Sequence, residues 1–138
     1  MQEIILVKYG EMALKGMNKK TFEDILVKNI KRRIKSEITR AQSTIYIAPL
    51  DEFFDADEAI ERLKKVFGIA ALCRAAVCEK DFEDIKSKSI EYLDEVLSYA
   101  KTFKVTAKRA DKSFPMKSPE ICRELGGVLL EKFPHLTV

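Results

Sequence analysis

The stretch EIILVKYGEMALKGMNKKTFEDILVKNIKRRI, residues 3–34, decides the fold of the first half of the chain. Its opening, residues 3–9, is a compact apolar run rich in β-branched residues, which indicates a strand that Gly10 stops. Asn18 can then cap a helix that runs to about Ser36. One face of this helix is apolar at helical spacing and carries Phe22, Ile25, Leu26, Ile30 and Ile34. The stretch therefore predicts a strand followed by an amphipathic helix.

A second helix is predicted further along. Asp55 and Glu58, three residues apart, form a cap pair at its start. Gly68 stops it. Its inward residues at helical spacing are Ala59, Ile60, Leu63 and Val66.

Short strands are expected on both sides of this second helix. Two lie around residues 38–40 and 44–48, and Pro49 ends the second of them. Another covers residues 69–77. The order strand, helix, strand, strand, helix, strand predicts an α+β, ferredoxin-like βαββαβ domain over residues 1–76. In that arrangement four antiparallel strands carry both helices on one face.

The remaining residues, 77–138, begin and end with predicted helices. Asp81 can cap the first of them. Its expected core face consists of Phe82, Ile85, Ser89, Leu93, Val96, Leu97 and Ala100. Ser118 as the cap and Pro119 at the first helical position start the other, which Pro134 ends.

Between these helices, residues 102–107 alternate apolar and polar side chains, as a half-buried strand does. One strand cannot cover two broad apolar helix faces, and its edges are unpaired. We therefore expect residues 77–138 to be a truncated α/β domain, incomplete at its C-terminus, and the whole chain to be the N-terminal piece of a longer protein. Alternatively, the first sheet or a dimer partner completes it. The exposed edge also predicts self-association.

The composition of the 138 residues, 34% charged and 46% hydrophobic, indicates a globular protein. No apolar run approaches the roughly 20 residues of a membrane span, and the opening residues lack the pattern of a signal peptide. Three cysteines without CxxC spacing are typical of a reducing cytoplasm. No nucleotide-loop, metal or nucleophile motif occurs. The chain is therefore expected to carry no catalytic residue and no metal or other cofactor.

The basic residues are unevenly distributed. Residues 15–35 hold eight against two acidic ones, and residues 101–117 hold six against one. Solvated surface explains such clusters, but so does a polyanion partner. The stronger candidate is the side of residues 102–107 that faces solvent, extended by the loop and helix start that follow. Its candidate phosphate-binding residues are Lys104, Lys108, Arg109, Lys112 and Lys117, with Lys15, Lys19 and Lys20 as a second group.

At these residues the chain resembles a known family. Residues 7–20, VKYGEMALKGMNKK, are similar to the opening of the tRNA 4-thiouridine synthetases, also called tRNA sulfurtransferases. Residues 103–114, FKVTAKRADKSF, with Ser118-Pro119-Glu120 and Leu125-Gly126-Gly127, resemble the THUMP domain of the same family. The two matches occur in the family's order and together extend over nearly the whole chain.

This resemblance implies a ferredoxin-like domain and a THUMP domain that bind tRNA at its acceptor stem and 3′ end. It assigns the chemistry to a downstream ATP-pyrophosphatase domain with an SGGxDS loop, which uses ATP and Mg²⁺. That domain makes 4-thiouridine and supplies sulfur for the thiamine thiazole, with a cysteine desulfurase as sulfur donor. The chain lacks SGGxDS, so we expect a cytoplasmic, non-catalytic tRNA-binding fragment.

Two other interpretations remain open at this point. A THUMP domain also occurs in RNA methyltransferases and pseudouridine synthases, although residues 10–16, GEMALKG, argue against these classes. A stand-alone ferredoxin-like module for a small ligand, or an enzyme of the acylphosphatase kind, would have the same first domain. The acylphosphatase chemistry requires an arginine in the loop after the first strand, where the sequence has only Lys15.

Overall fold

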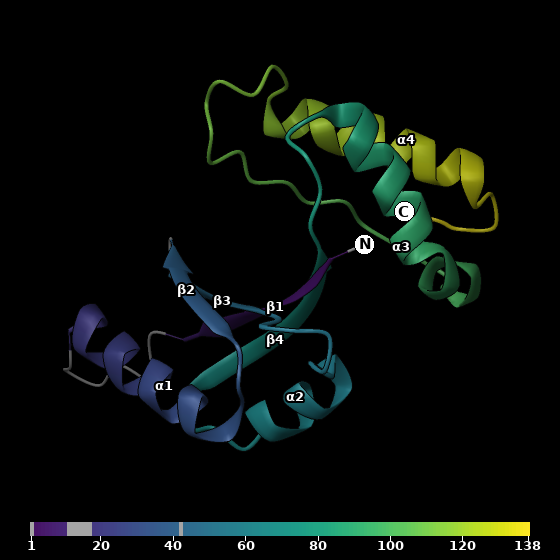
Figure 1. Cartoon of the computed structure of the whole chain (residues 1–138). Helices are drawn as coiled ribbons and strands as arrows, with labels where there is room; N and C mark the ends of the chain where they lie inside the picture. Colours follow the sequence, from purple (N-terminus) through teal and green to yellow (C-terminus); the bar gives the residue numbers. More distant parts are fainter. Residues whose placement is uncertain (1, 11–17, 42) are drawn as a thin grey trace. The chain divides into compact units, whose positions relative to one another are not determined.

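The computed structural model describes residues 2–10, 18–41 and 43–138 (Figure 1). The chain divides into two compact units, Met1–Val77, here called unit 1, and Cys78–Val138, called unit 2. Each unit has its own apolar core, so each is described by itself. Within the described residues, no helix is both long and apolar enough to cross a membrane.

Unit 1 is built on a four-stranded antiparallel sheet with the order β2-β3-β1-β4. Its elements are β1 (Glu3–Tyr9), α1 (Lys19–Arg33), β2 (Glu37–Ala41), β3 (Thr44–Ala48), α2 (Ala56–Leu63) and β4 (Ile69–Ala76). Ile5 of β1 lies opposite Ile47 on one side and Arg74 on the other, which fixes the register of the central strand. Both helices cover the same face of the sheet (Figure 1). The predicted ferredoxin-like βαββαβ order is therefore confirmed.

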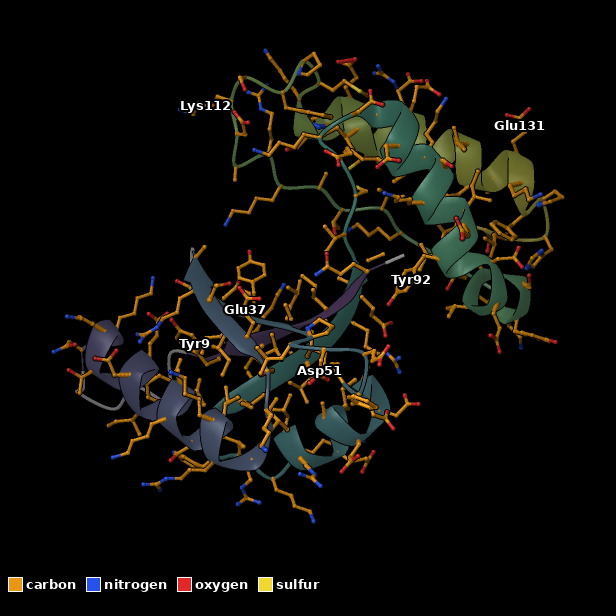
Figure 2. The ribbon with its side chains drawn as sticks, in the orientation of Figure 1. Tyr9, Glu37, Asp51, Tyr92, Lys112 and Glu131 are labelled. Carbon is orange, nitrogen blue, oxygen red and sulfur yellow. The ribbon has the colours of Figure 1, made fainter. Side chains whose placement is uncertain are left out.

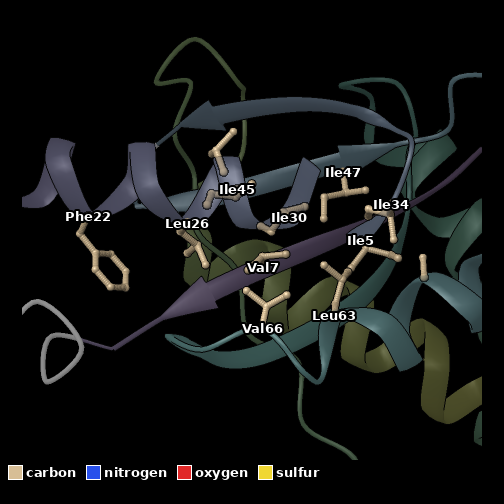
Figure 3. Close-up of a cluster of buried hydrophobic side chains, with 12 residues drawn as sticks. Ile5, Val7, Phe22, Leu26, Ile30, Ile34, Ile45, Ile47, Leu63 and Val66 are labelled. Atoms are coloured by element: carbon tan, nitrogen blue, oxygen red, sulfur yellow. The ribbon is translucent and has the colours of Figure 1, made fainter. Parts of the chain in front are cut away.

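The core of unit 1 lies between that sheet face and the helices (Figure 3). Alternate residues of the two central strands point into it, because side chains of a strand alternate between its faces. The fully buried side chains come from both layers and are Ile5, Val7, Leu26, Ile30, Ile45, Ile47 and Leu63. Burying one such side chain contributes about 1.5–3 kcal/mol. This cluster holds the helices against the sheet.

The helix starts of unit 1 follow the sequence prediction. The Asn18 side chain accepts the N–H of Thr21 at 2.8 Å. Asp55 accepts the N–H groups of Asp57 at 2.9 Å and Glu58 at 3.2 Å. These oxygens satisfy N–H groups that have no partner inside the helix.

The end of α2 differs from the prediction. The helix stops at Leu63, and a tight turn follows in which the Val66 N–H donates to the Leu63 carbonyl at 3.0 Å. Val66 is still buried, as expected. Gly68 then adopts a φ of 98°, and a Cβ there would lie 2.8 Å from the ring of Phe22. Only glycine takes this position without strain.

Unit 2 contains α3 (Phe82–Tyr99) and α4 (Ser118–Lys132), packed around Leu97, Leu129, Phe133 and Leu136. Asp81 caps α3 as predicted, by accepting the N–H of Asp84. The predicted core face of α3 is wrong at Val96, whose side chain is 64% exposed. Leu93, Leu97 and Ala100 lie in or against the cluster as predicted, and Ile90, which was not predicted, packs against it as well.

The strand predicted over residues 102–107 does not form. A single parallel bridge joins Thr102 to Thr137, with the Phe103 N–H donating to the Thr137 carbonyl at 3.1 Å. The alternation of side chains is nevertheless present, since Phe103 and Val105 are half-buried and Lys104 is exposed. A strand requires a neighbour to pair with along its length, and the described part of unit 2 provides one only at Thr137.

Candidate nucleic-acid interface

The first part of the candidate interface is the extended segment after Thr102. Phe103 and Val105 pack against the core of unit 2, and this holds the segment in place. Lys104 and Lys108 alternate with these residues and are exposed. Because their positions differ by an even number of residues, the two lysines share the solvent side of an extended chain. They form a short basic row.

Arg109 has a different position from the lysines. Its side chain is half-buried, and its Nη1 donates to the Phe114 carbonyl at 3.1 Å. Its backbone N–H donates to Ser118 Oγ at 3.2 Å. Arg109 therefore does not extend the exposed row of Lys104 and Lys108, and its contact with phosphate stays a prediction. Arg109 connects the two ends of the loop 108–117, and a planar guanidinium with several N–H donors is suited to such a connection.

Asp111 stabilises the inside of the same loop. Its carboxylate accepts the Ser113 hydroxyl at 2.6 Å and the Ser113 N–H at 2.9 Å, and it pairs with Lys80 Nζ at 3.1 Å. The two hydrogen bonds from Ser113, and then the bond from Lys80, lower the pKa of Asp111 to about 2. The Phe114 N–H donates to the Asp111 carbonyl at 3.1 Å. The loop thus has a defined shape before any partner binds.

The loop ends at the N-terminus of α4. Lys117 is the cap residue there, and no side chain caps the helix. The prediction of Ser118 as the cap is wrong because its hydroxyl accepts the Arg109 N–H instead. The partial positive charge of a helix start and its free N–H groups favour an anion. Exposed Lys117 lies directly beside them.

Four lysines of unit 2 are therefore available to an anionic partner: Lys104, Lys108, Lys112 and Lys117. All four are exposed, and Figure 2 shows Lys112 on the loop that precedes α4. Among the described residues, none of the four has a carboxylate oxygen within 4.0 Å. No carboxylate of the described residues neutralises their charge. We call them the lysine group.

The second set of predicted residues belongs to unit 1. Lys19 and Lys20 occupy the first turn of α1 and are exposed. That turn contains no acidic residue, and two cations at the positive end of a helix dipole are unfavourable by themselves. An anionic partner would offset this cost. Lys15 lies outside the residues that the structure describes.

Sequence reasoning missed Lys80 and Asp111 as residues that shape the loop, and it assigned other roles to Arg109 and Ser118. A signal for Asp111 was present: Asp111-x-Ser113 is the spacing of an Asx turn, in which a carboxylate accepts the N–H two residues later. Among the described residues, no group of three His, Cys, Asp or Glu side chains could hold a metal ion. The geometry therefore defines a preformed basic surface without a metal centre in the described chain.

Comparison with known proteins agrees with the two-unit architecture. The family model of the ThiI ferredoxin-like domain matches residues 4–73, and the THUMP domain model matches residues 79–138. These matches define an α+β chain that pairs a ferredoxin-like domain with a THUMP domain. The chain belongs to the ThiI family.

Curated relatives carry a more specific name. The chain is 48% identical over its whole length to a probable tRNA sulfurtransferase of Acetivibrio thermocellus and 42% identical to one of Alkaliphilus metalliredigens. It spans 37% and 36% of the lengths of these two proteins. The chain thus corresponds to about a third of the curated relatives it matches.

Solved structures also match the chain. The crystal structure of a 4-thiouridine synthetase–RNA complex with bound ATP matches the whole chain with a TM-score of 0.81 and 36% identity, over 35% of its own chain. A protein from Pyrococcus horikoshii Ot3 matches 96% of the chain with a TM-score of 0.76 and 25% identity, over 45% of its own chain.

Proposed function

We propose that this chain is the tRNA-binding N-terminal part of a tRNA sulfurtransferase. The observation that carries the proposal is the lysine group, four exposed cations around a loop of fixed shape that have no carboxylate partner among the residues that the structure describes. The names of the relatives support the choice of tRNA as the polyanion. Because the matching ferredoxin-like model is that of ThiI, the methyltransferase, pseudouridine synthase and small-ligand alternatives are less well supported.

The lysine group binds phosphate oxygens in this proposal. Each phosphate that a lysine neutralises releases condensed counterions, which makes the affinity depend on salt. With four contacts at about 0.7–0.9 each, the logarithm of the affinity falls with the logarithm of the salt concentration with a slope of about −3. Arg109 is not counted, because its guanidinium bonds within the loop.

Phosphate contacts position a nucleic acid and read no base sequence. The lysine group therefore binds many tRNAs alike, through the acceptor stem and 3′ end. The preformed loop favours this mode because ordering costs little when the shape exists before binding. Lys19 and Lys20 of unit 1 are proposed to contribute further phosphate contacts.

The activity of the whole protein is a proposal for the longer chain that its relatives have. We assign 4-thiouridine formation, ATP and Mg²⁺ binding and the supply of sulfur to the thiamine thiazole to that longer protein, working in the cytoplasm with a cysteine desulfurase. The proposal assigns no catalytic step to the described residues. Their role is to bind and orient the tRNA.

The test is tRNA binding by fluorescence anisotropy across a salt series, with a single-stranded RNA of equal length for comparison. Lys108→Gln should weaken tRNA binding and make the salt slope shallower by about 0.9, the share of one phosphate contact. Lys132→Gln is the matched control, since Lys132 is exposed in the last turn of α4. Equal effects of both variants, or no binding by the unaltered chain at low salt, would contradict the proposal.

A further inference from the structure

A second basic surface lies at the carboxyl end of α1 in unit 1. Four exposed cations gather there within five residues: Lys31, Arg32, Arg33 and Lys35. In the described part of the chain none of them has a carboxylate oxygen within 4.0 Å. Positive charge in a last helical turn complements the helix dipole, which amounts to about half an elementary charge. Four cations exceed what that dipole can neutralise.

These cations line a pocket of about 390 Å³. That volume is within the roughly 300–1,000 Å³ of small-ligand sites. The acidic groups of the same pocket are already engaged. Asp55 caps α2, and Glu58 forms an ion pair with Arg62, which also donates to the Arg33 carbonyl at 3.2 Å. Counting Arg62, the pocket lining holds five cations against two carboxylates, so the net charge that it offers to a ligand is positive.

An aromatic ring completes the pocket. Phe53 lines it and is 84% exposed, whereas its neighbour Phe54 packs against the core of unit 1. The backbone between β3 and α2 is fixed, because the Phe53 N–H donates to Asp51 Oδ1 at 2.9 Å and the Phe54 N–H donates to the Asp51 carbonyl at 3.4 Å. Figure 2 labels Asp51 at this turn. The turn thus holds Phe53 toward solvent and Phe54 toward the core.

A planar apolar ring beside unpaired cations fits one ligand chemistry especially well. A nucleobase stacks on the ring, and its phosphate binds the cations, as in proteins that hold single-stranded nucleic acids. A phenylalanine that stays exposed lacks the roughly 2 kcal/mol of stabilising free energy that its burial would contribute. A stacked base would recover part of this.

We propose that this pocket binds one unpaired nucleotide, with its base on Phe53 and its phosphate on the cations of residues 31–35. The proposal rests on the proposed RNA-binding function and adds to it a contact on unit 1. The unpaired nucleotide belongs to a single-stranded part of the RNA. A free mononucleotide has the same chemistry, and the experiment separates the two sources.

The test uses the whole chain and a fluorescein-labelled single-stranded oligoadenylate, with AMP as a competitor. Phe53→Ala should weaken oligoadenylate binding about tenfold, because loss of a stacking ring has roughly that effect. Phe53→Trp should restore binding. Phe67→Ala is the matched control, since Phe67 is also highly exposed, at 80%, and does not line the pocket.

The charge contribution is tested separately. Lys31→Gln/Arg32→Gln should make the salt slope for oligoadenylate shallower by about 1.4, from two contacts at about 0.7 each. Lys65→Gln is the control, because Lys65 is exposed and lies outside the pocket lining. If AMP displaces the oligonucleotide from the unaltered chain but not from Phe53→Ala, the pocket also binds free nucleotides. Phe53-dependent oligonucleotide binding without competition by AMP supports the RNA strand as the source.

The failures can be told apart. If Phe53→Ala leaves oligoadenylate binding unchanged while Lys108→Gln weakens tRNA binding, the pocket proposal is overturned and the tRNA proposal stands. The same holds if the chain binds tRNA but no oligoadenylate. If the chain binds neither RNA at low salt, both proposals are overturned.

Discussion

Tyr9, the last residue of β1, donates its hydroxyl hydrogen to the carboxylate of Glu23 in α1. The ring of Tyr9 lies 5.3 Å from that of Phe22, at an angle of 50°. Burial and the hydrogen bond to Glu23 raise the pKa of Tyr9 to about 12. One side chain therefore links the first strand to the first helix by both packing and a hydrogen bond.

This contact predicts a loss of stability at high pH. A group that binds its proton more tightly in the folded state stabilises that state fully at pH values below its ordinary pKa, here 10.0. This stabilisation is lost as the pH rises toward about 12. The free energy of unfolding, measured by urea denaturation, should fall over this window. The ultraviolet absorbance of tyrosinate should show a matching step near pH 12. Persistence of that step in Tyr9→Phe would assign it to another tyrosine.

Gly68 provides a test of the turn after α2. Gly68→Ala should lower the free energy of unfolding of unit 1 by about 1–3 kcal/mol, because the residue has a φ of 98° and its Cβ would contact the Phe22 ring. Thermal denaturation followed by circular dichroism measures the change. Gly127→Ala is the matched control, since a Cβ there meets nothing within 4 Å and alanine favours a helix by up to about 1 kcal/mol. Equal stability of both variants would show that the turn tolerates a side chain.

Arg109 allows the charge of the loop 108–117 to be tested separately from its shape. Arg109→Lys keeps the positive charge but loses the guanidinium bond to the Phe114 carbonyl. A hydrogen bond of this kind contributes about 0.5–1.5 kcal/mol, so we expect tRNA affinity to fall roughly 2- to 10-fold. Lys108→Arg, which changes an exposed residue of the lysine group, should leave affinity unchanged. An unaltered affinity in Arg109→Lys would mean that the loop does not depend on this bond.

The architecture of unit 1 was predictable because its buried residues follow simple periods. Ile5 and Val7 alternate on one strand, and Leu26 and Ile30 recur at helical spacing. The same periodicity gave a wrong prediction at Val96, which has helical spacing but is exposed and lies outside the small core cluster of unit 2. Periodicity identifies a face, whereas the width of that face depends on the partner that covers it.

The candidate site was less predictable. The alternation of residues 103–107 continues to Arg109 and places it on the inner side, so the sequence contained this signal. The bond from Arg109 to Phe114 and the pair of Lys80 with Asp111 are tertiary contacts that no local pattern specifies. Alternation also predicted a strand at residues 102–107. Whether such a segment becomes a strand depends on a neighbour, and that information lies elsewhere in the chain.

The bonds that shape the loop and the lysines that surround it are different residues. Arg109, Asp111 and Ser118 hold the loop, whereas the lysine group makes no ion pair in the described chain. Substitutions among these lysines therefore carry little risk to folding. These lysines can therefore be substituted one at a time without disturbing the loop. Under the proposed function, the affinity for RNA, and with it the time a bound molecule stays before release, is thus adjustable in small steps on an unchanged scaffold.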